Sequence, residues 1–126
     1  MKWLLLALPM LLALSGAPVH LAIKPWTGND LQTTSSSAAK YRLEVNGKPN
    51  VAVRLAAKGV ANGWLAAFCT PKYCSPQHVE ASLPSSGQTV FQFELIRESV
   101  SAPKESGATI VNADGASVTV PKVYRE

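Results

Sequence analysis

The residues with the most chemical potential lie in one short stretch, FCTPKYCSPQHVEASLP, residues 68–84. This stretch contains both cysteines of the chain, Cys69 and Cys74, and one of its two histidines, His78. Paired cysteines form disulfides, bind metal ions as thiolates, or exchange electrons in redox reactions. Which of these applies decides whether the chain performs chemistry or only binds.

A disulfide between Cys69 and Cys74 is the first interpretation. An even cysteine count in an exported domain is the usual setting for such a bond. The spacing is C-x4-C, and a turn over the intervening residues can bring the two sulfurs together, provided that the Cα atoms come within about 7 Å. Closing so small a ring removes a modest amount of conformational entropy from the unfolded chain, about 2 kcal/mol.

A metal site is the alternative. The motif YCSPQH looks very like the YCSPH ligand loop of plastocyanin-type cupredoxins, which are also β sandwiches. Such a copper site needs a second histidine upstream and usually an axial methionine. His20 and both methionines lie in or beside the N-terminal apolar segment, so the ligand count excludes blue copper. A looser copper or zinc site from reduced Cys69, Cys74 and His78 stays open, because thiolates and imidazole suit both ions.

Catalytic chemistry has little support in the sequence. Thiol redox enzymes use C-x-x-C at the start of a helix, and neither that spacing nor that setting is present. The sequence has no G-x-S-x-G, phosphate-binding loop or dinucleotide fingerprint. Glu80 and Glu94 are expected to face solvent, unlike the paired carboxylates of a glycosidase. We therefore predict that the chain is not an enzyme and needs no cofactor.

Three further residues are candidates for contacts with a partner. Trp26 precedes a polar linker, and Tyr73 lies beside Lys72 between the two cysteines. Aromatic and basic residues recur at binding hot spots. The chain has 12 Lys and Arg against 8 Asp and Glu, a formal net charge of +4. Because the basic residues are scattered, without a run or stripe, the pattern argues against nucleic acid as the partner.

The N-terminal sequence predicts export. Lys2 precedes an apolar stretch and small residues follow it, which is typical of a secretory signal peptide. We predict a signal over residues 1–17, with cleavage between residues 15 and 22, and a secreted or periplasmic location. Contact with a membrane is expected only if this segment stays uncleaved. Residues 18–39 are interpreted as an N-terminal segment that ends in a Ser/Thr-rich linker, TTSSSAA.

Residues 40–126 have the pattern of an all-β domain. Apolar and polar residues alternate in short runs, which predicts strands with one buried face. Trp64 is expected to be the large central residue of the core, and the Asp114-Gly115 dipeptide is expected to turn the last hairpin. Short strands separated by turn residues indicate an antiparallel β sandwich. About seven strands are predicted, at residues 41–45, 51–55, 64–69, 79–83, 88–96, 108–112 and 117–120.

Several motifs follow one another in a recognisable order: YRLEV-NGKP-NVAVRLAA, the Gly63-Trp64 pair, LPSSGQTVFQFEL, APKESGATIV and SVTV. Over about residues 40–121 this order resembles an Ig-like accessory module of bacteria and archaea. It is similar to the NPCBM-associated Ig-like family and to the Ig-like C-terminal domain of cytochrome-oxidase accessory proteins. The resemblance implies an Ig-like sandwich that binds without catalysis, with a protein or polysaccharide partner outside the cytoplasm. The loop from Cys69 to Cys74 is an addition to that pattern.

Overall fold

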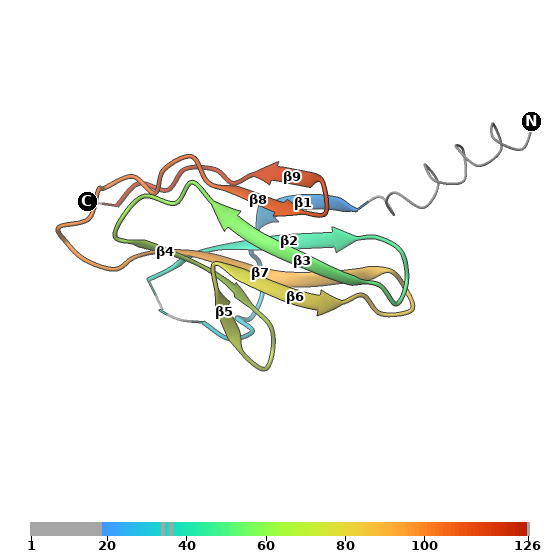
Figure 1. The fold of residues 1–126 in the computed structure, drawn as a ribbon. Coiled ribbons are helices and arrows are strands. Elements are labelled where there is room, and N and C mark those ends of the chain that lie inside the picture. The colour runs from blue at the N-terminus through green and yellow to red at the C-terminus, as the bar shows by residue number, and fades with distance from the viewer. Residues whose placement is uncertain (1–18, 34, 36, 126) are drawn as a thin grey trace, which may run out of the picture.

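The computed structural model describes residues 19–33, 35 and 37–125, which fold into two antiparallel β-sheets (Figure 1). Sheet A has five strands in the order β1-β2-β7-β4-β5, and sheet B has four in the order β6-β3-β8-β9. The prediction of an all-β fold is confirmed, with nine strands in the described residues where the sequence predicted about seven. The strands are β1 (His20–Pro25), β2 (Ala39–Asn46), β3 (Ala52–Lys58), β4 (Trp64–Cys69), β5 (Cys74–Pro76), β6 (His78–Ser82), β7 (Gln88–Arg97), β8 (Ile110–Ala113) and β9 (Ala116–Thr119).

The two strands beyond the prediction are β1 and β5, which form the two edges of sheet A. β1 pairs with β2 from His20↔Asn46 to Pro25↔Tyr41, so sheet A begins upstream of residue 40. β5 is only three residues long and pairs with the end of β4. The predicted signal peptide, residues 1–17, lies outside the described residues.

The core lies between the inner faces of the two sheets, because every second residue of a strand points to the same side. Phe68 of β4 is fully buried there, and its ring centroid lies 6.2 Å from that of Phe91 and 5.1 Å from that of Phe93, both on β7. The tilted and edge-to-face arrangements of these rings are the ones that aromatic quadrupoles favour. The buried apolar residues of the core are Leu43, Val45, Val53, Leu55, Trp64, Ala66, Phe68, Val79, Leu83, Phe91, Phe93, Leu95, Ala102, Val111, Ala113, Val120 and Val123.

Trp64 opens β4 and is buried in this core, as the sequence predicts. Its indole N–H donates to the carbonyl oxygen of Pro103 at 2.6 Å, so the one polar atom of the ring has a partner. Gly63, the preceding residue, has a φ of +88°, and a Cβ there would lie 2.6 Å from the Cβ of Ala102. Glycine at position 63 therefore lets the loop with Ala102 and Pro103 pack closely beside the indole.

The last hairpin joins β8 to β9 through the predicted Asp114-Gly115 turn. Both residues have positive φ, 44° and 89°. A two-residue hairpin turn of type I′ has positive φ at both central residues, a conformation that glycine adopts without a steric penalty. Ala113 and Ala116 pair directly across the turn and start the ladder at that end of the hairpin.

Candidate functional site

The loop that joins β4 to β5, residues 69–74, is closed by a disulfide; we call it the Cys loop. The Sγ atoms of Cys69 and Cys74 lie 2.06 Å apart and their Cα atoms 4.0 Å apart. The two residues are also direct partners in the β4–β5 ladder, so both the backbone and the side chains join the ends of the loop. The predicted disulfide is confirmed, and it is compatible with an oxidising location outside the cytoplasm.

Thr70 organises the tip of the Cys loop. Its backbone N–H donates to the carbonyl oxygen of Tyr73 at 2.8 Å. Its hydroxyl oxygen accepts hydrogen bonds from the backbone N–H groups of Lys72 and Tyr73, each at 3.2 Å. The side chain of Tyr73 stays 49% exposed at the tip, beside the exposed Lys72. The two predicted contact residues in this loop are thus presented to solvent on a turn whose backbone is held in place.

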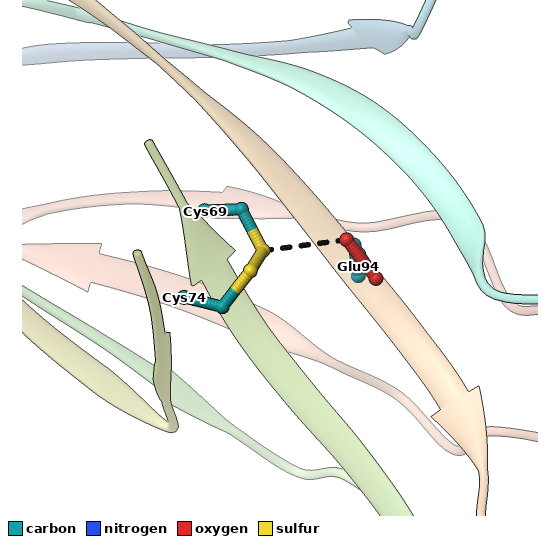
Figure 2. Close-up of side chains that lie close together, drawn as sticks. All are labelled: Cys69, Cys74 and Glu94. Carbon is teal, nitrogen blue, oxygen red and sulfur yellow. Dashed lines mark hydrogen bonds between the residues drawn. A yellow bond between two sulfur atoms is a disulfide. The ribbon is translucent and has the colours of Figure 1, made fainter. Parts of the chain in front are cut away.

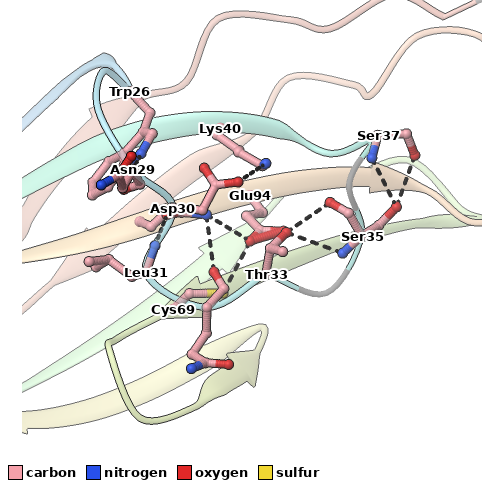
Figure 3. A network of polar contacts seen from close by, with 12 residues as sticks. Trp26, Asn29, Asp30, Leu31, Thr33, Ser35, Ser37, Lys40, Cys69 and Glu94 are labelled. Atoms are coloured by element: carbon pink, nitrogen blue, oxygen red, sulfur yellow. Dashed lines mark hydrogen bonds and ion pairs between the residues drawn. The ribbon is translucent and has the colours of Figure 1, made fainter.

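Two polar side chains, Gln92 and Glu94 of β7, are completely buried on the outer face of sheet A, with 0% exposure each. Alternation along β7 points both away from the core, which is why the sequence predicts a solvated Glu94. That prediction is wrong, because residues 26–33 lie across this face and bond to both side chains (Figure 3). We call residues 26–33 the covering segment.

The side-chain amide of Gln92 holds the covering segment as a backbone peptide group of a neighbouring strand would. Its Oε1 accepts a hydrogen bond from the backbone N–H of Leu31 at 2.8 Å, and its Nε2 donates to the carbonyl oxygen of Gln32 at 3.1 Å. The same Nε2 also donates to Oε2 of Glu94 at 3.2 Å. The buried amide therefore has partners for its oxygen and for both of its protons.

Glu94 joins the covering segment to the Cys loop. The hydroxyl of Thr33 lies 3.0 Å from Oε1 of Glu94 and 2.8 Å from the carbonyl oxygen of Ser35, and its single proton can be donated to either oxygen (Figure 3). Oε2 of Glu94 lies 3.3 Å from Sγ of Cys69 (Figure 2). A disulfide sulfur has no proton, so in the oxidised chain this last contact is one of sulfur against oxygen. A Cys69 thiol would donate its proton to the same oxygen. Gln32 adds a second link, since its Nε2 donates to the carbonyl oxygen of Pro71 in the Cys loop at 3.0 Å.

Trp26 begins the covering segment and is half-buried. Its backbone N–H donates to the carbonyl oxygen of Lys40, and its indole N–H donates to the carbonyl oxygen of Asn29, both at 3.3 Å (Figure 3). The ammonium group of Lys40 in turn forms an ion pair with Asp30. Trp26, the third predicted contact residue, thus lies where the covering segment is fastened to β2.

His78 lies in sheet B, where it is exposed on β6 and pairs with Ala56 of β3. In the part of the chain that the structure describes, the potential metal ligands that come together are Cys69, Cys74 and Glu94, whose ligand atoms all lie within 4.8 Å of one another. The structure therefore brings the two cysteines together as predicted, but it places Glu94 rather than His78 in their group.

Beyond the covering segment, the outer face of sheet A is open and charged. Glu44 of β2 lies 3.0 Å from the ammonium of Lys24 and 2.8 Å from Nε of Arg42. Hydrogen bonds from Arg42 and then Lys24 lower the pKa of Glu44 below its usual 4.5. One outer face thus holds a covered carboxylate and an uncovered one.

One feature of the sequence indicates that Gln92 and Glu94 are buried. The outward-facing residues of β7 include Val90 and Ile96 on either side of Gln92 and Glu94. A face in water is not usually built around apolar residues in this way. The pattern indicates that something covers the middle of β7, but it does not say which segment.

Comparison with known proteins gives no relative. No protein-family model matches the chain, and no similar curated protein or solved structure is found. Among the residues that the structure describes, no helix is long and apolar enough to span a membrane. The function therefore has to be argued from the Cys loop and the buried pair beneath the covering segment.

Proposed function

We propose that this chain is a non-catalytic binding module that works outside the cytoplasm and uses the tip of the Cys loop as its contact surface. One observation carries this proposal: Tyr73 is 49% exposed on a turn that is closed by a disulfide and by the hydrogen bonds of Thr70. Tyrosine offers a large contact area with few rotatable bonds, and basic residues such as the neighbouring Lys72 often accompany it at hot spots. A protein or a polysaccharide outside the cytoplasm is the expected partner.

The rigidity of the loop is what makes it suitable for binding. Association costs free energy for every flexible group that becomes ordered, so a contact loop that is already fixed loses less on binding. The Cys loop is fixed at its base by the Cys69–Cys74 disulfide and at its side by the bond from Gln32 to Pro71. An Ig-like sandwich would supply the scaffold, in keeping with the resemblance of the motifs, and a disulfide suits the proposed oxidising location.

Export with removal of the signal peptide is part of the same proposal, and the pairing of β1 with β2 favours a cleavage site before residue 20. A cut after Ala22 would remove His20, Leu21 and Ala22, which pair with Asn46, Val45 and Glu44 of β2. A cut before residue 20 leaves β1 whole. We therefore expect the exported chain to begin between residues 16 and 20, and its N-terminal sequence, read by mass spectrometry, tests this directly.

Binding is tested with the exported chain on a polysaccharide array and against the extracytoplasmic proteins of the organism that produces it. Tyr73→Ala and Lys72→Ala are the test variants. Tyr124→Ala is the matched control, because Tyr124 is an exposed tyrosine outside the Cys loop, 59% exposed against 49% for Tyr73. If Tyr73 is a hot spot, its truncation costs about 2 kcal/mol, or about 30-fold in affinity.

The control decides how the result is interpreted. A partner that is lost with Tyr73→Ala and retained with Tyr124→Ala supports the Cys loop as the contact surface. A partner that binds all variants equally, or one that loses affinity equally with both tyrosine variants, contradicts it. Circular dichroism of each variant should match that of the wild type, since both tyrosines lie on the surface.

A further inference from the structure

We infer that, once its disulfide is reduced, the chain holds one zinc ion between Cys69, Cys74 and Glu94. The three side chains offer two thiolate sulfurs and a carboxylate oxygen, all within 4.8 Å of one another. Zinc takes such ligands at about 2.3 Å for sulfur and about 2.0–2.2 Å for oxygen, so small side-chain shifts suffice to surround one ion. This inference goes beyond the binding role proposed above and does not depend on it.

The strands already direct the three ligands to one place. Cys69 and Cys74 are paired across β4 and β5, and Glu94 lies on β7, the neighbour of β4 on its other side (Figure 2). The carboxylate is close to the sulfurs in the oxidised chain, with Oε2 of Glu94 3.3 Å from Sγ of Cys69. Ligands on paired strands are held more precisely than ligands on free loops, which favours metal binding.

Burial adds a second argument. Cys69 and Glu94 are both completely buried, whereas Cys74 is half-buried and gives the group an accessible side. Thr33 and Gln92 already hydrogen-bond the carboxylate of Glu94 and fix its orientation. Outer partners of this kind orient metal ligands in known zinc sites. A fourth position would face the accessible side, where water can occupy it.

Histidine is the ligand that the sequence suggested, and the structure assigns the role differently. His78 is exposed on β6, in sheet B, whereas both cysteines belong to sheet A. Glu94 lies within the group and His78 does not. The two candidate third ligands therefore make opposite predictions for mutation, which is the basis of the test.

The disulfide and the zinc site exclude each other, because the same two sulfurs form either the S–S bond or the bonds to the metal. A dithiol reductant opens the site: its two thiols become a disulfide, and the two electrons and two protons convert Cys69–Cys74 into two thiols. Zinc then displaces the two thiol protons as both sulfurs bind it as thiolates. Binding should therefore release protons and weaken as the pH falls.

The test uses the exported chain, reduced with a phosphine that offers no thiol to the metal. Zinc affinity is measured by competition with a chromophoric chelator, and cobalt serves as a spectroscopic substitute that reports thiolate ligation. We expect one ion per reduced chain and none per oxidised chain. Glu94→Gln should lower the affinity at least about tenfold, because even partners outside the ligand set typically cost 10–100-fold. His78→Ala and the matched exposed variant Glu80→Gln should leave it unchanged.

X-ray absorption at the zinc edge of the reduced wild type gives an answer that does not depend on how any variant folds. Two sulfur ligands with oxygen and no imidazole scattering support the inference. Imidazole scattering, a reduced chain that binds no zinc, or a loss of affinity in His78→Ala equal to that in Glu94→Gln overturns it. Tyr73 stays intact in all these variants, so this outcome is independent of the binding role of the Cys loop.

Discussion

Glu80 and Glu94 differ in their surroundings although both point away from the core. Glu80 lies on the outer face of sheet B, where its carboxylate lies 2.8 Å from Nε of Arg54 and its side chain is 59% exposed. Glu94 lies on the outer face of sheet A, where it is completely buried and bonded to Thr33 of the covering segment. Sheet B has an open outer face at this point, whereas sheet A is covered by a further layer of chain.

The difference shows that alternation identifies the side of a sheet on which a residue lies, but not whether that side is in water. Polar contacts hold the layer over sheet A, since Gln92 bonds the backbone of Leu31 and Gln32. Buried polar groups are tolerated when they have partners. In the described residues, the one buried side-chain polar atom without a partner is Oγ1 of Thr109, which lies outside this network.

Removing the carboxylates of Glu94 and Glu80 in turn tests most directly whether the two outer faces differ. Glu94→Ala should lower the free energy of unfolding by about 2–3 kcal/mol, because Thr33 and Gln92 lose a completely buried acceptor. Glu80→Ala should change it by less than about 0.5 kcal/mol, as is usual for an exposed ion pair. Urea unfolding of the oxidised chains measures both values. An equal decrease in the free energy of unfolding in the two variants would show that the covering segment contributes nothing to stability.

The Cys loop is bonded to the covering segment, because Nε2 of Gln32 donates to the carbonyl oxygen of Pro71, so removing its disulfide should affect that side of the molecule. The double variant Cys69→Ala, Cys74→Ala should have a free energy of unfolding about 2 kcal/mol lower than the wild type, the value that chain entropy gives for so small a ring. Thermal unfolding of the variant, and of the wild type with and without a reductant, provides the measurement. If the reduced wild type were as stable as the oxidised one, the disulfide would have no stabilising role.

The fold could be predicted from the sequence where local pattern and burial coincide. β4 was predicted at its observed bounds, because its apolar run begins at the Gly63-Trp64 pair and ends at the first cysteine. The Asp114-Gly115 hairpin was predicted from two residues that permit positive φ. β5 has only three residues, too few for a period of two to be visible, and β1 lies next to the predicted signal peptide, whose apolar composition hides its alternation.

The candidate site was predictable only in part, for a related reason. The disulfide depends on a cysteine count and a spacing, which are local properties of the sequence. The burial of Glu94 depends on Thr33, and that of Gln92 on Leu31, residues 61 positions away in each case. The polar, low-complexity stretch that begins at Thr33 has the composition of a linker, and composition does not reveal that a buried glutamate will accept a hydrogen bond from its first residue.

Within the covering segment, Thr33 is predicted to contribute to stability and Thr27 is not. Thr33→Val removes the hydroxyl that bonds Oε1 of Glu94 and the carbonyl oxygen of Ser35 while keeping the shape of the side chain, and should lower the free energy of unfolding by about 1 kcal/mol. Thr27→Val is the matched control, because Thr27 is exposed in the same segment. Hydrogen exchange at the backbone N–H of Leu31, which is bonded to Gln92, should become faster in Thr33→Val and stay unchanged in Thr27→Val. Similar exchange in both variants would contradict a fastening role for Thr33.

The smallest effect is expected at Glu44, at the uncovered end of the same face. Its pKa is lowered in the folded chain by hydrogen bonds from Arg42 and Lys24, so ionised Glu44 favours folding. This contribution is present above the ordinary pKa of 4.5 and is lost as the pH falls through the lower pKa of the folded state. Glu44→Gln should therefore be less stable than the wild type near about pH 7, and the difference should close towards about pH 3.

Urea unfolding of the wild type and Glu44→Gln across this pH range measures that difference. High salt should reduce it near neutral pH, because Glu44, Arg42 and Lys24 are all accessible to counterions. A difference that stays constant with pH would mean that the ion pairs do not stabilise the fold. A difference that closes with acid but resists salt would instead place Glu44 in an environment like that of Glu94, and the contrast between the covered and open parts of sheet A would then be wrong.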